Sequence, residues 1–382
     1  MSSKYVSLYS LAEWKNGLAF KQIHFAEQGK PVIRIAELKN GITAQTAYTQ
    51  QSFDESVHLT KGDMVFSWSG NPETSIDVFW YDLPDGWLNQ HIFKVTANED
   101  VHKLYLYYLL KSLKPKFTAI ASNKQTTGLG HVTIKDMKEL MIDLPDYDTQ
   151  RAIGEYLYSI DQKAYINQQI NDNLQQQAAA FFSSLYDRSN AEVRFTDLIQ
   201  ILGGGTPKTG ENTYWNGNIA FFTPKDVGTP YTLITEKTIS KEGLSHCNSR
   251  LYPVNTVFVT ARGTVGKVGM SGVPMAMNQS CYALVGKETH QLLVYFYTLK
   301  AVDRLKHKAS GAVFDAITTR DFESEQIMKL SDDDATAFLR VAEPMFQEVL
   351  NNNIENLRLS TLRDSLLPKL MSGEIDVSAV QL

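Results

Sequence analysis

The sequence has little cysteine and no long apolar run. Its two cysteines, Cys247 and Cys281, are too few for a disulfide framework or a cysteine-rich metal site, and we expect both to be small buried residues in a reducing environment. No run of roughly eighteen apolar residues is present to cross a bilayer. The opening residues MSSKYVSLYS lack the basic and apolar segments of a signal peptide. We therefore expect a cytoplasmic protein without a membrane partner.

Familiar catalytic motifs are missing as well. In GGGTPKTG (203–210), Pro207 precedes Lys208 where a phosphate-binding P-loop requires glycine, so ATP is not an expected ligand. No histidine stands in a His-Glu-x-x-His zinc motif, and no Gly-x-Ser-x-Gly elbow occurs. The Asn/Asp-Pro-Pro-aromatic motif of adenine methyltransferases is also lacking. These absences favour a non-catalytic binding protein with neither a metal site nor a cofactor in this chain.

Charge alternates along the chain of 382 residues, whose formal net charge is −5. Residues 101–138 and 249–320 are basic, whereas residues 139–192 and 321–382 are acidic. A local basic block is expected to attract phosphate even in a protein of negative total charge. A solvated lysine surface is the alternative for one such block, but its recurrence favours a repeated nucleic-acid surface.

The two halves of the chain align with each other. KPVIRIAELKNG (30–41) lies over GNIAFFTPKDVG (217–228), KGDMVFSWSG (61–70) over VNTVFVTARG (254–263), and LNQHIFKV (88–95) over MNQSCYAL (277–284). An internal repeat determines architecture before other features do. We therefore predict an α+β protein with an internal pseudo-two-fold repeat, in which two mixed α/β domains (1–146 and 191–331) are each followed by a helical segment (147–190 and 332–382).

Apolar residues at intervals of three and four predict one buried stripe on each helical segment. We expect the two helices to pair antiparallel as a coiled-coil-like spacer. About 35 helical residues rise roughly 50 Å, which exceeds the roughly 34 Å of one DNA turn. Pro344 predicts either a kink or the start of the second helix nearby. The stripe residues, which are the candidate partner-binding positions of the helices, are Ile153, Leu157, Ile170, Leu174, Phe181, Leu185, Phe338, Met345, Ile354, Leu357, Leu362 and Leu366.

Two segments carry a resemblance to a known family. GGGTPKTGENTYWNGNIAFFTPKDVG (203–228) resembles the opening motif of target recognition domains in the specificity (S) subunits of type I restriction-modification systems. LSTLRDSLLPKLMSGEI (359–375) is similar to the helical region that closes those subunits. The first half departs from the motif, because NGLAFKQ (16–22) replaces Gly-Gly-Thr-Pro and Glu37-Leu38-Lys39 stands for Pro224-Lys225-Asp226. We expect two related domains that read different sequences.

The resemblance implies a DNA-binding subunit without catalysis of its own. In this family each recognition domain reads one half of an asymmetric, bipartite site in double-stranded DNA. The helices separate the domains and dock two methyltransferase (M) subunits, which carry S-adenosylmethionine and methylate adenine at N6; restriction (R) subunits can join the complex. A structural adaptor whose globular domains bind proteins is the alternative.

Candidate DNA contacts are basic, amide and aromatic residues at predicted turns and strand ends. Arg262 lies in a turn from which a guanidinium can reach guanine. Asn278-Gln279 and the matching Asn89-Gln90 either read adenine or hold strand ends. The full predicted set is Arg34, Lys39, Trp68, Asn89, Gln90, Lys94, Asn123, Lys124, Gln125, Thr206, Lys208, Lys225, Arg262, Lys267, Asn278 and Gln279.

Tyr214 and Trp215 form an aromatic pair inside the opening motif. They either stack on a base or pack against the protein. Because the following Asn216-Gly217 is typical of a turn, we expect the pair to anchor that turn by packing.

Overall fold

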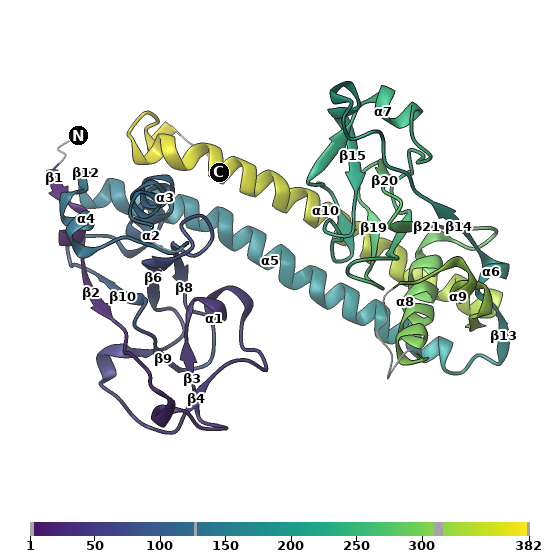
Figure 1. The fold of residues 1–382 in the computed structure, drawn as a ribbon, viewed down its shortest axis with the longest axis horizontal. Helices are drawn as coiled ribbons and strands as arrows, with labels where there is room; N and C mark the ends of the chain where they lie inside the picture. The colour runs from purple at the N-terminus through teal and green to yellow at the C-terminus, as the bar shows by residue number, and fades with distance from the viewer. Residues whose placement is uncertain (1–3, 126–127, 309–315, 380–382) are drawn as a thin grey trace. The chain divides into compact units, whose positions relative to one another are not determined.

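The computed structural model describes residues 4–125, 128–308 and 316–379 (Figure 1). The chain divides into two compact units, a first unit of Met1–Gln162 with Leu359–Leu382 and a second unit of Lys163–Arg358. Each unit contains one mixed α/β globule. Each also contains part of both long helices, α5 (Tyr147–Tyr186) and α10 (Asp332–Met371).

Two four-stranded sheets form the framework of the first unit. One sheet has the order β2-β10-β6-β8 with antiparallel neighbours, and the other, β4-β3-β9-β5, contains the parallel pair β3 and β9. The pairs β1-β12 and β11-β7 are separate. The strands are β1 (Lys4–Ser7), β2 (Ala12–Asn16), β3 (Lys30–Ile33), β4 (Tyr48–Thr49), β5 (His58–Leu59), β6 (Met64–Ser67), β7 (Ser69–Gly70), β8 (Asp77–Trp80), β9 (Gly86–Leu88), β10 (Ile92–Ala97), β11 (Gly130–His131) and β12 (Met141–Leu144).

The main core of the first unit joins the β2-β10-β6-β8 sheet to helices. Phe66 and Phe93 of the sheet share one buried cluster with Leu106 of α2 and Leu157 of α5. A second cluster lies around Trp87 under the β3-β9 sheet. The helices are η1 (Leu8–Leu11), η2 (Gln22–His24), α1 (Ile35–Asn40), η3 (Glu55–Val57), α2 (Lys103–Ser112), α3 (Lys114–Asn123), α4 (Ile134–Glu139) and η5 (Val377–Ala379).

The second unit repeats this plan with a five-stranded sheet, β14-β21-β18-β19-β16, and a three-stranded sheet, β17-β15-β20. β13 pairs separately with β22. The strands are β13 (Ala191–Arg194), β14 (Ile199–Gly203), β15 (Trp215–Phe222), β16 (Tyr231–Thr232), β17 (Lys237–Ile239), β18 (Val257–Thr260), β19 (Val268–Ser271), β20 (Met275–Met277), β21 (Cys281–Gly286) and β22 (Gln326–Lys329). The remaining helices are α6 (Phe195–Leu198), η4 (Asn212–Tyr214), α7 (Lys241–Ser245), α8 (Gln291–Lys308) and α9 (Thr319–Ser324).

Strand order confirms the predicted repeat. The order β2-β10-β6-β8 corresponds to β14-β21-β18-β19, and the parallel pair β3-β9 corresponds to β15-β20. α4 and α9 both begin with a capping box, in which Thr133 pairs with Asp136 and Thr318 with Asp321. The α+β class and the two-fold internal repeat therefore hold in the structure.

The detailed register corrects one of the sequence alignments. Asn89 N donates to Ile33 O and Asn278 N donates to Phe222 O, each at 3.0 Å, so Ile33 corresponds to Phe222. Glu37 therefore corresponds to Asp226. The sequence alignment had instead paired Glu37 with Pro224, two positions earlier. The sequence alignment was insensitive to this shift because both strands end in consecutive apolar residues.

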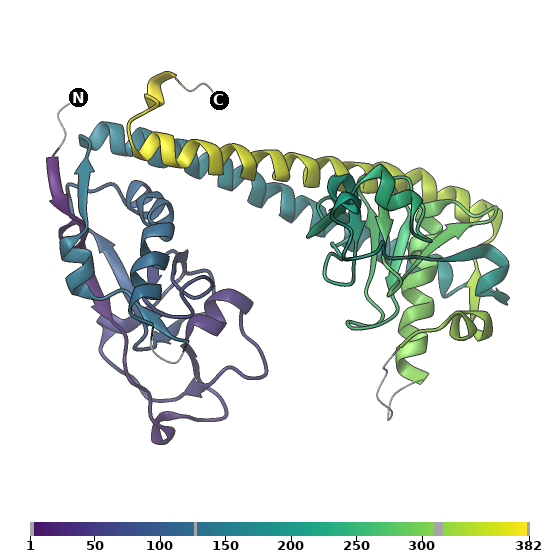
Figure 2. The same ribbon diagram turned by 45° about the horizontal axis from the view of Figure 1, so that its top comes forward.

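The two long helices pair antiparallel within each unit, and Figure 2 shows them side by side. In the first unit Arg363 Nη1 donates to Asp161 Oδ1 at 2.7 Å. In the second, Asn167 bonds to Asn356, and Phe182 packs on Phe338 at 5.4 Å between ring centroids. α10 continues through the exposed Pro344, so the helix does not begin there. Among the described residues, no helix has the length and apolarity to cross a bilayer.

Most residues of the predicted stripe are buried or half-buried, but two are exposed. Ile153, Leu157, Leu185 and Phe338 are buried as expected, while Leu174, Phe181, Met345, Ile354, Leu357 and Leu366 are half-buried. Ile170 and Leu362 are instead exposed, at 40% and 43%. Asn167 and Asn171, close to Ile170 on α5, are instead buried, and the Nδ2 of each donates to an asparagine on α10.

Candidate nucleic-acid interface

A glycine and an asparagine form the same backbone frame in both halves. A Cβ on Gly17 would lie 2.2 Å from the Asn89 carbonyl oxygen, and one on Gly204 would lie 2.2 Å from that of Asn278. Only glycine allows the chain to approach so closely. Asn278 also uses its Oδ1 to accept from Ser280 N at 3.0 Å. Asn278 therefore uses its side chain to hold a strand end, whereas Asn89 contributes to the frame through its backbone.

A carboxylate caps the turn after β3 and after β15. Arg34 N donates to Glu37 Oε2 at 3.0 Å, and Thr223 N donates to Asp226 Oδ2 at 2.8 Å. Arg34 also forms side-chain bonds to Glu37, which is 2% exposed. Burial raises the pKa of the Glu37 carboxyl, but these bonds outweigh burial and lower it. Arg34 is thus committed largely to a structural ion pair.

The second unit presents its candidate contacts on neighbouring turns. Arg262 N donates to Ser280 O at 3.3 Å, which places the Arg262 turn beside Gln279. Thr206 Oγ1 donates to Gln279 Oε1, which connects the Gly-Gly-Thr-Pro turn to the same place. The Arg262 side chain is exposed. The structure therefore brings Thr206, Arg262, Asn278 and Gln279 together.

The predicted lysines of the second unit are exposed around these turns. Lys208 and Lys267 have no acidic partner within ion-pair distance in the described part of the chain, whereas Lys225 lies 3.6 Å from Glu236. Thr264 Oγ1 donates to Pro224 O at 3.3 Å and connects the turn after Arg262 with the Lys225 turn. Exposed, unpaired ammonium groups are available to neutralise phosphates.

The aromatic pair of the opening motif packs within the protein, as predicted. Tyr214 stacks on His246 at 4.9 Å, and Trp215 makes an edge contact with Phe221 at 5.5 Å. Trp215 Nε1 donates to Lys208 O at 3.2 Å. Asn216, with a φ of 59°, and Gly217 lie within β15 at the register shift between Trp215 and Ile219, so the expected turn is instead an irregularity of the strand. The pair therefore holds the loop that carries Lys208.

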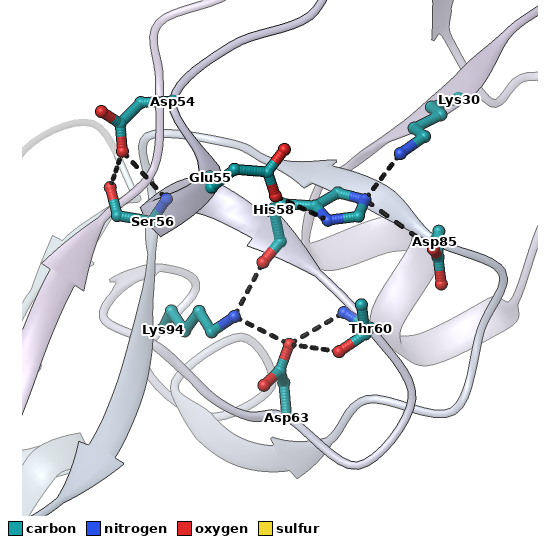
Figure 3. A network of polar contacts seen from close by, with 9 residues as sticks. All are labelled: Lys30, Asp54, Glu55, Ser56, His58, Thr60, Asp63, Asp85 and Lys94. Atoms are coloured by element: carbon teal, nitrogen blue, oxygen red, sulfur yellow. Dashed lines mark hydrogen bonds and ion pairs between the residues drawn. The ribbon is translucent and has the colours of Figure 1, made fainter.

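Lys94 of the first unit belongs to an internal polar network (Figure 3). Its Nζ donates to His58 O at 2.8 Å and lies 2.9 Å from Asp63 Oδ2, and its side chain is 22% exposed. Asp63 in turn caps Thr60, whose N–H donates to it at 2.8 Å. Lys30 contacts the His58 ring at 2.8 Å. The network anchors a loop, so Lys94 has little freedom to meet DNA.

The other candidates of the first unit divide into paired and free groups. Lys124 forms an ion pair with Asp136. Burial raises the pKa of Asp136, but Lys124 and the Thr133 cap together lower it. Lys39, Asn123 and Gln125 are exposed. Trp68 Nε1 donates to Asn16 Oδ1 at 3.1 Å, and Gln90 lies on the adjacent turn.

Two residues that sequence analysis did not select emerge from the register. Leu18 N donates to Leu88 O, and Gly205 N donates to Met277 O, which makes Leu18 equivalent to Gly205. Lys21 is then the counterpart of Lys208, and it is likewise exposed. His91 is exposed beside Trp68, with 5.8 Å between ring centroids. Only correct alignment of the halves reveals these positions.

The cysteines do not contribute to this surface chemistry. Cys281 is fully buried, and burial raises the pKa of its thiol to about 12. Cys247 is half-buried rather than buried, and its Sγ donates to Leu244 O at 3.5 Å. Both are free thiols.

Comparisons with known proteins give one consistent result. The family model of the type I restriction modification DNA specificity domain matches residues 2–176 and 188–329. The chain is 23% identical over 354 residues to the HindI specificity subunit of Haemophilus influenzae, across 71% of this chain and 77% of that one. It is 25% identical over 234 residues to the EcoR124I/EcoR124II specificity subunit of Escherichia coli, across 57% and 56% of the two chains.

A solved structure agrees in fold. The S subunit of a type I restriction-modification system from M. genitalium superposes with a TM-score of 0.62 at 14% identity, over 97% of this chain and 96% of that one. The two matched family segments each contain one repeat and together cover most of the chain. The chain therefore belongs to the type I restriction-modification DNA specificity family, whose members are the non-catalytic specificity components of these systems.

Proposed function

We propose that this chain recognises an asymmetric, bipartite site in double-stranded DNA and brings adenine-N6 methyltransferase subunits to it. The observation that carries this proposal is that both halves use the same backbone frame and place different side chains at equivalent positions after β6 and after β18, such as the half-buried Ser69 and the exposed Arg262. Trp68-Ser69 in the first half corresponds to Ala261-Arg262 in the second, because Val132 N and Ile317 N donate to the matching carbonyls at 2.9 Å. Different side chains on one frame are expected to read different bases.

Partner docking is assigned to the long helices. α5 exposes Tyr158, Tyr165, Ile166 and Ile170, at 36% to 50% of their surfaces, and α10 exposes Leu362. Apolar side chains that remain exposed beside one another on a helix mark protein contact surfaces. We assign these positions to two M subunits, which would carry S-adenosylmethionine, and to restriction subunits where a system includes them. This chain would act in the cytoplasm and hold no cofactor of its own.

Co-expression with a methyltransferase subunit tests the proposal. The complex is expected to bind a split duplex site in a sequence-dependent and salt-sensitive manner. Methylome sequencing of cells with and without this chain should reveal methylated adenines in one two-part motif. Replacing residues 191–331 with another recognition domain should change one half of that motif only. A change in both halves, or methylation independent of this chain, would falsify the proposal.

A further inference from the structure

The same glutamine occupies the same place in both halves. Gln90 and Gln279 each follow the frame asparagine, in the turns between β9 and β10 and between β20 and β21. Gln90 is half-buried and Gln279 is exposed. An amide side chain presents both a donor and an acceptor, so the atom that the protein holds determines which atoms remain for a ligand.

The first-half glutamine is held by its amide nitrogen. Gln90 Nε2 lies 3.1 Å from His91 Nε2. Because an amide nitrogen only donates, the ring Nε2 is the acceptor in this contact. The His91 ring packs against Trp68, which Asn16 orients. Within the described residues, the Gln90 carbonyl oxygen has no hydrogen-bond donor.

The second-half glutamine is held by its carbonyl oxygen. Thr206 Oγ1 donates to Gln279 Oε1. The register makes Ala19 the counterpart of Thr206 and Ser280 the counterpart of His91. Neither contact can therefore form in the other half, since alanine lacks the hydroxyl and serine lacks the imidazole. The amide nitrogen of Gln279 makes no hydrogen bond to the part of the chain that the structure describes.

We propose that Gln90 and Gln279 are equivalent specificity-determining residues, and that His91 and Thr206 are positioning residues that set their amides in opposite orientations. The inference rests on the proposed function as a DNA reader. Gln90 offers a free carbonyl oxygen and one N–H, which match N6 and N7 of adenine in the major groove. Gln279 offers two N–H groups, which match acceptors such as guanine O6 and N7 or thymine O4. One residue type thereby reads two different base edges.

Exchange of the positioning residues tests this inference in the complex of the full chain with its methyltransferase subunits. Thr206→Ala with Ser280→His removes the hydroxyl that holds Gln279 and introduces the imidazole that holds Gln90 in the first half. We expect one position of the second half-site to change from an acceptor-presenting base towards adenine, while the first half-site stays the same. Ala19→Thr with His91→Ser should alter only the first half-site. Gln279→Ala should reduce the discrimination between bases at one position of the second half-site roughly tenfold.

Matched variants at Thr206 separate orientation from general damage. Thr206→Ser keeps the hydroxyl and should retain the wild-type methylation motif. Thr206→Val keeps the shape of the side chain but lacks the hydroxyl, so the motif should become less specific at one position. The melting temperature of each variant checks that the domain is folded. An unchanged motif and discrimination in Thr206→Val or Gln279→Ala would overturn the inference. A wild-type complex that methylates no two-part motif would instead overturn the proposed function.

Discussion

Asn352 Nδ2 donates a 2.9 Å hydrogen bond to Asn171 Oδ1 across the helix pair of the second unit. Asn171 is 1% exposed and Asn352 is 6% exposed. Asn171 Nδ2 also donates to Asn353 at 2.9 Å, and Asn167 Nδ2 donates to Asn356 at the same distance. A shift of one helix past the other would leave these buried amides unpaired in an apolar seam, so the layer specifies a single register.

Substitution of Asn171 by leucine is expected to destabilise the second unit. The buried Asn352 Nδ2 and the half-buried Asn353 Oδ1 would lose their partner, which costs about 1–3 kcal/mol in the free energy of unfolding. Urea unfolding followed by circular dichroism measures the loss. Gln176→Leu, on an exposed face of the same helix, is the matched control. Equal stability of the two variants would show that the amide layer contributes nothing.

Gly204→Ala should distort the frame of the second recognition domain. The new Cβ would lie 2.2 Å from a backbone oxygen of Asn278, so the chain must shift. We expect a loss of about 1–3 kcal/mol in the free energy of unfolding and weaker recognition of one half-site. Gly210→Ala meets no atom within 4 Å and should change stability by less than about 0.5 kcal/mol. Similar melting temperatures for both variants would contradict this account.

The ion pairs of Asp77 predict a pH-dependent stability of the first unit. Its carboxylate lies 2.9 Å from Lys111 Nζ and 2.7 Å from Lys114 Nζ. Burial raises the pKa of Asp77, but the two lysines outweigh burial and lower it. The carboxylate therefore stabilises the fold above its unfolded pKa of about 3.9, and this contribution disappears as the pH falls through the lower folded pKa.

Asp77→Asn should consequently reduce stability most at neutral pH. Unfolding in urea at several pH values, down to about pH 3, is expected to show the wild type and the variant converging as the acid group is protonated. Lys116→Met, which removes an exposed lysine of the same region, should leave the pH dependence unchanged. A wild-type advantage that is constant across this pH range would exclude the proposed role of the ion pairs.

Removal of Lys208 is expected to affect DNA binding, whereas removal of Lys94 is expected to affect stability. Lys208→Ala should weaken DNA binding for all sequences and reduce the slope of log K against log salt by about one, because an exposed ammonium that contacts phosphate is lost. Lys94→Ala should leave that slope unchanged and lower the melting temperature, because Lys94 bonds to His58 and Asp63 inside the protein. Titrations of the complex with duplex at several salt concentrations distinguish the two effects.

Local patterns were sufficient to predict the repeat and the two long helices. Short continuous apolar runs define strands such as β6 and β18, and apolar residues at intervals of three and four define α5 and α10. The family resemblance likewise rests on contiguous motifs. The predicted DNA-binding set mixes solvent-facing and internally paired residues, because a basic side chain on a turn has the same sequence signature whether it faces solvent or an internal carboxylate. Arg34, Lys94 and Lys124 all have such carboxylate partners.

By itself the sequence determined that two related α/β domains alternate with two helices, since these features depend on residues close together in the chain. The tertiary structure decided which helix face is buried and which glutamine atoms are free. Neighbouring helix positions differ by about 100° in direction, so Ile170 and Asn171 compete for the same seam. Hydrophobicity alone favours the isoleucine. The amides of Asn352 and Asn353, about 180 residues away along the chain, reverse that preference because they pair with Asn171.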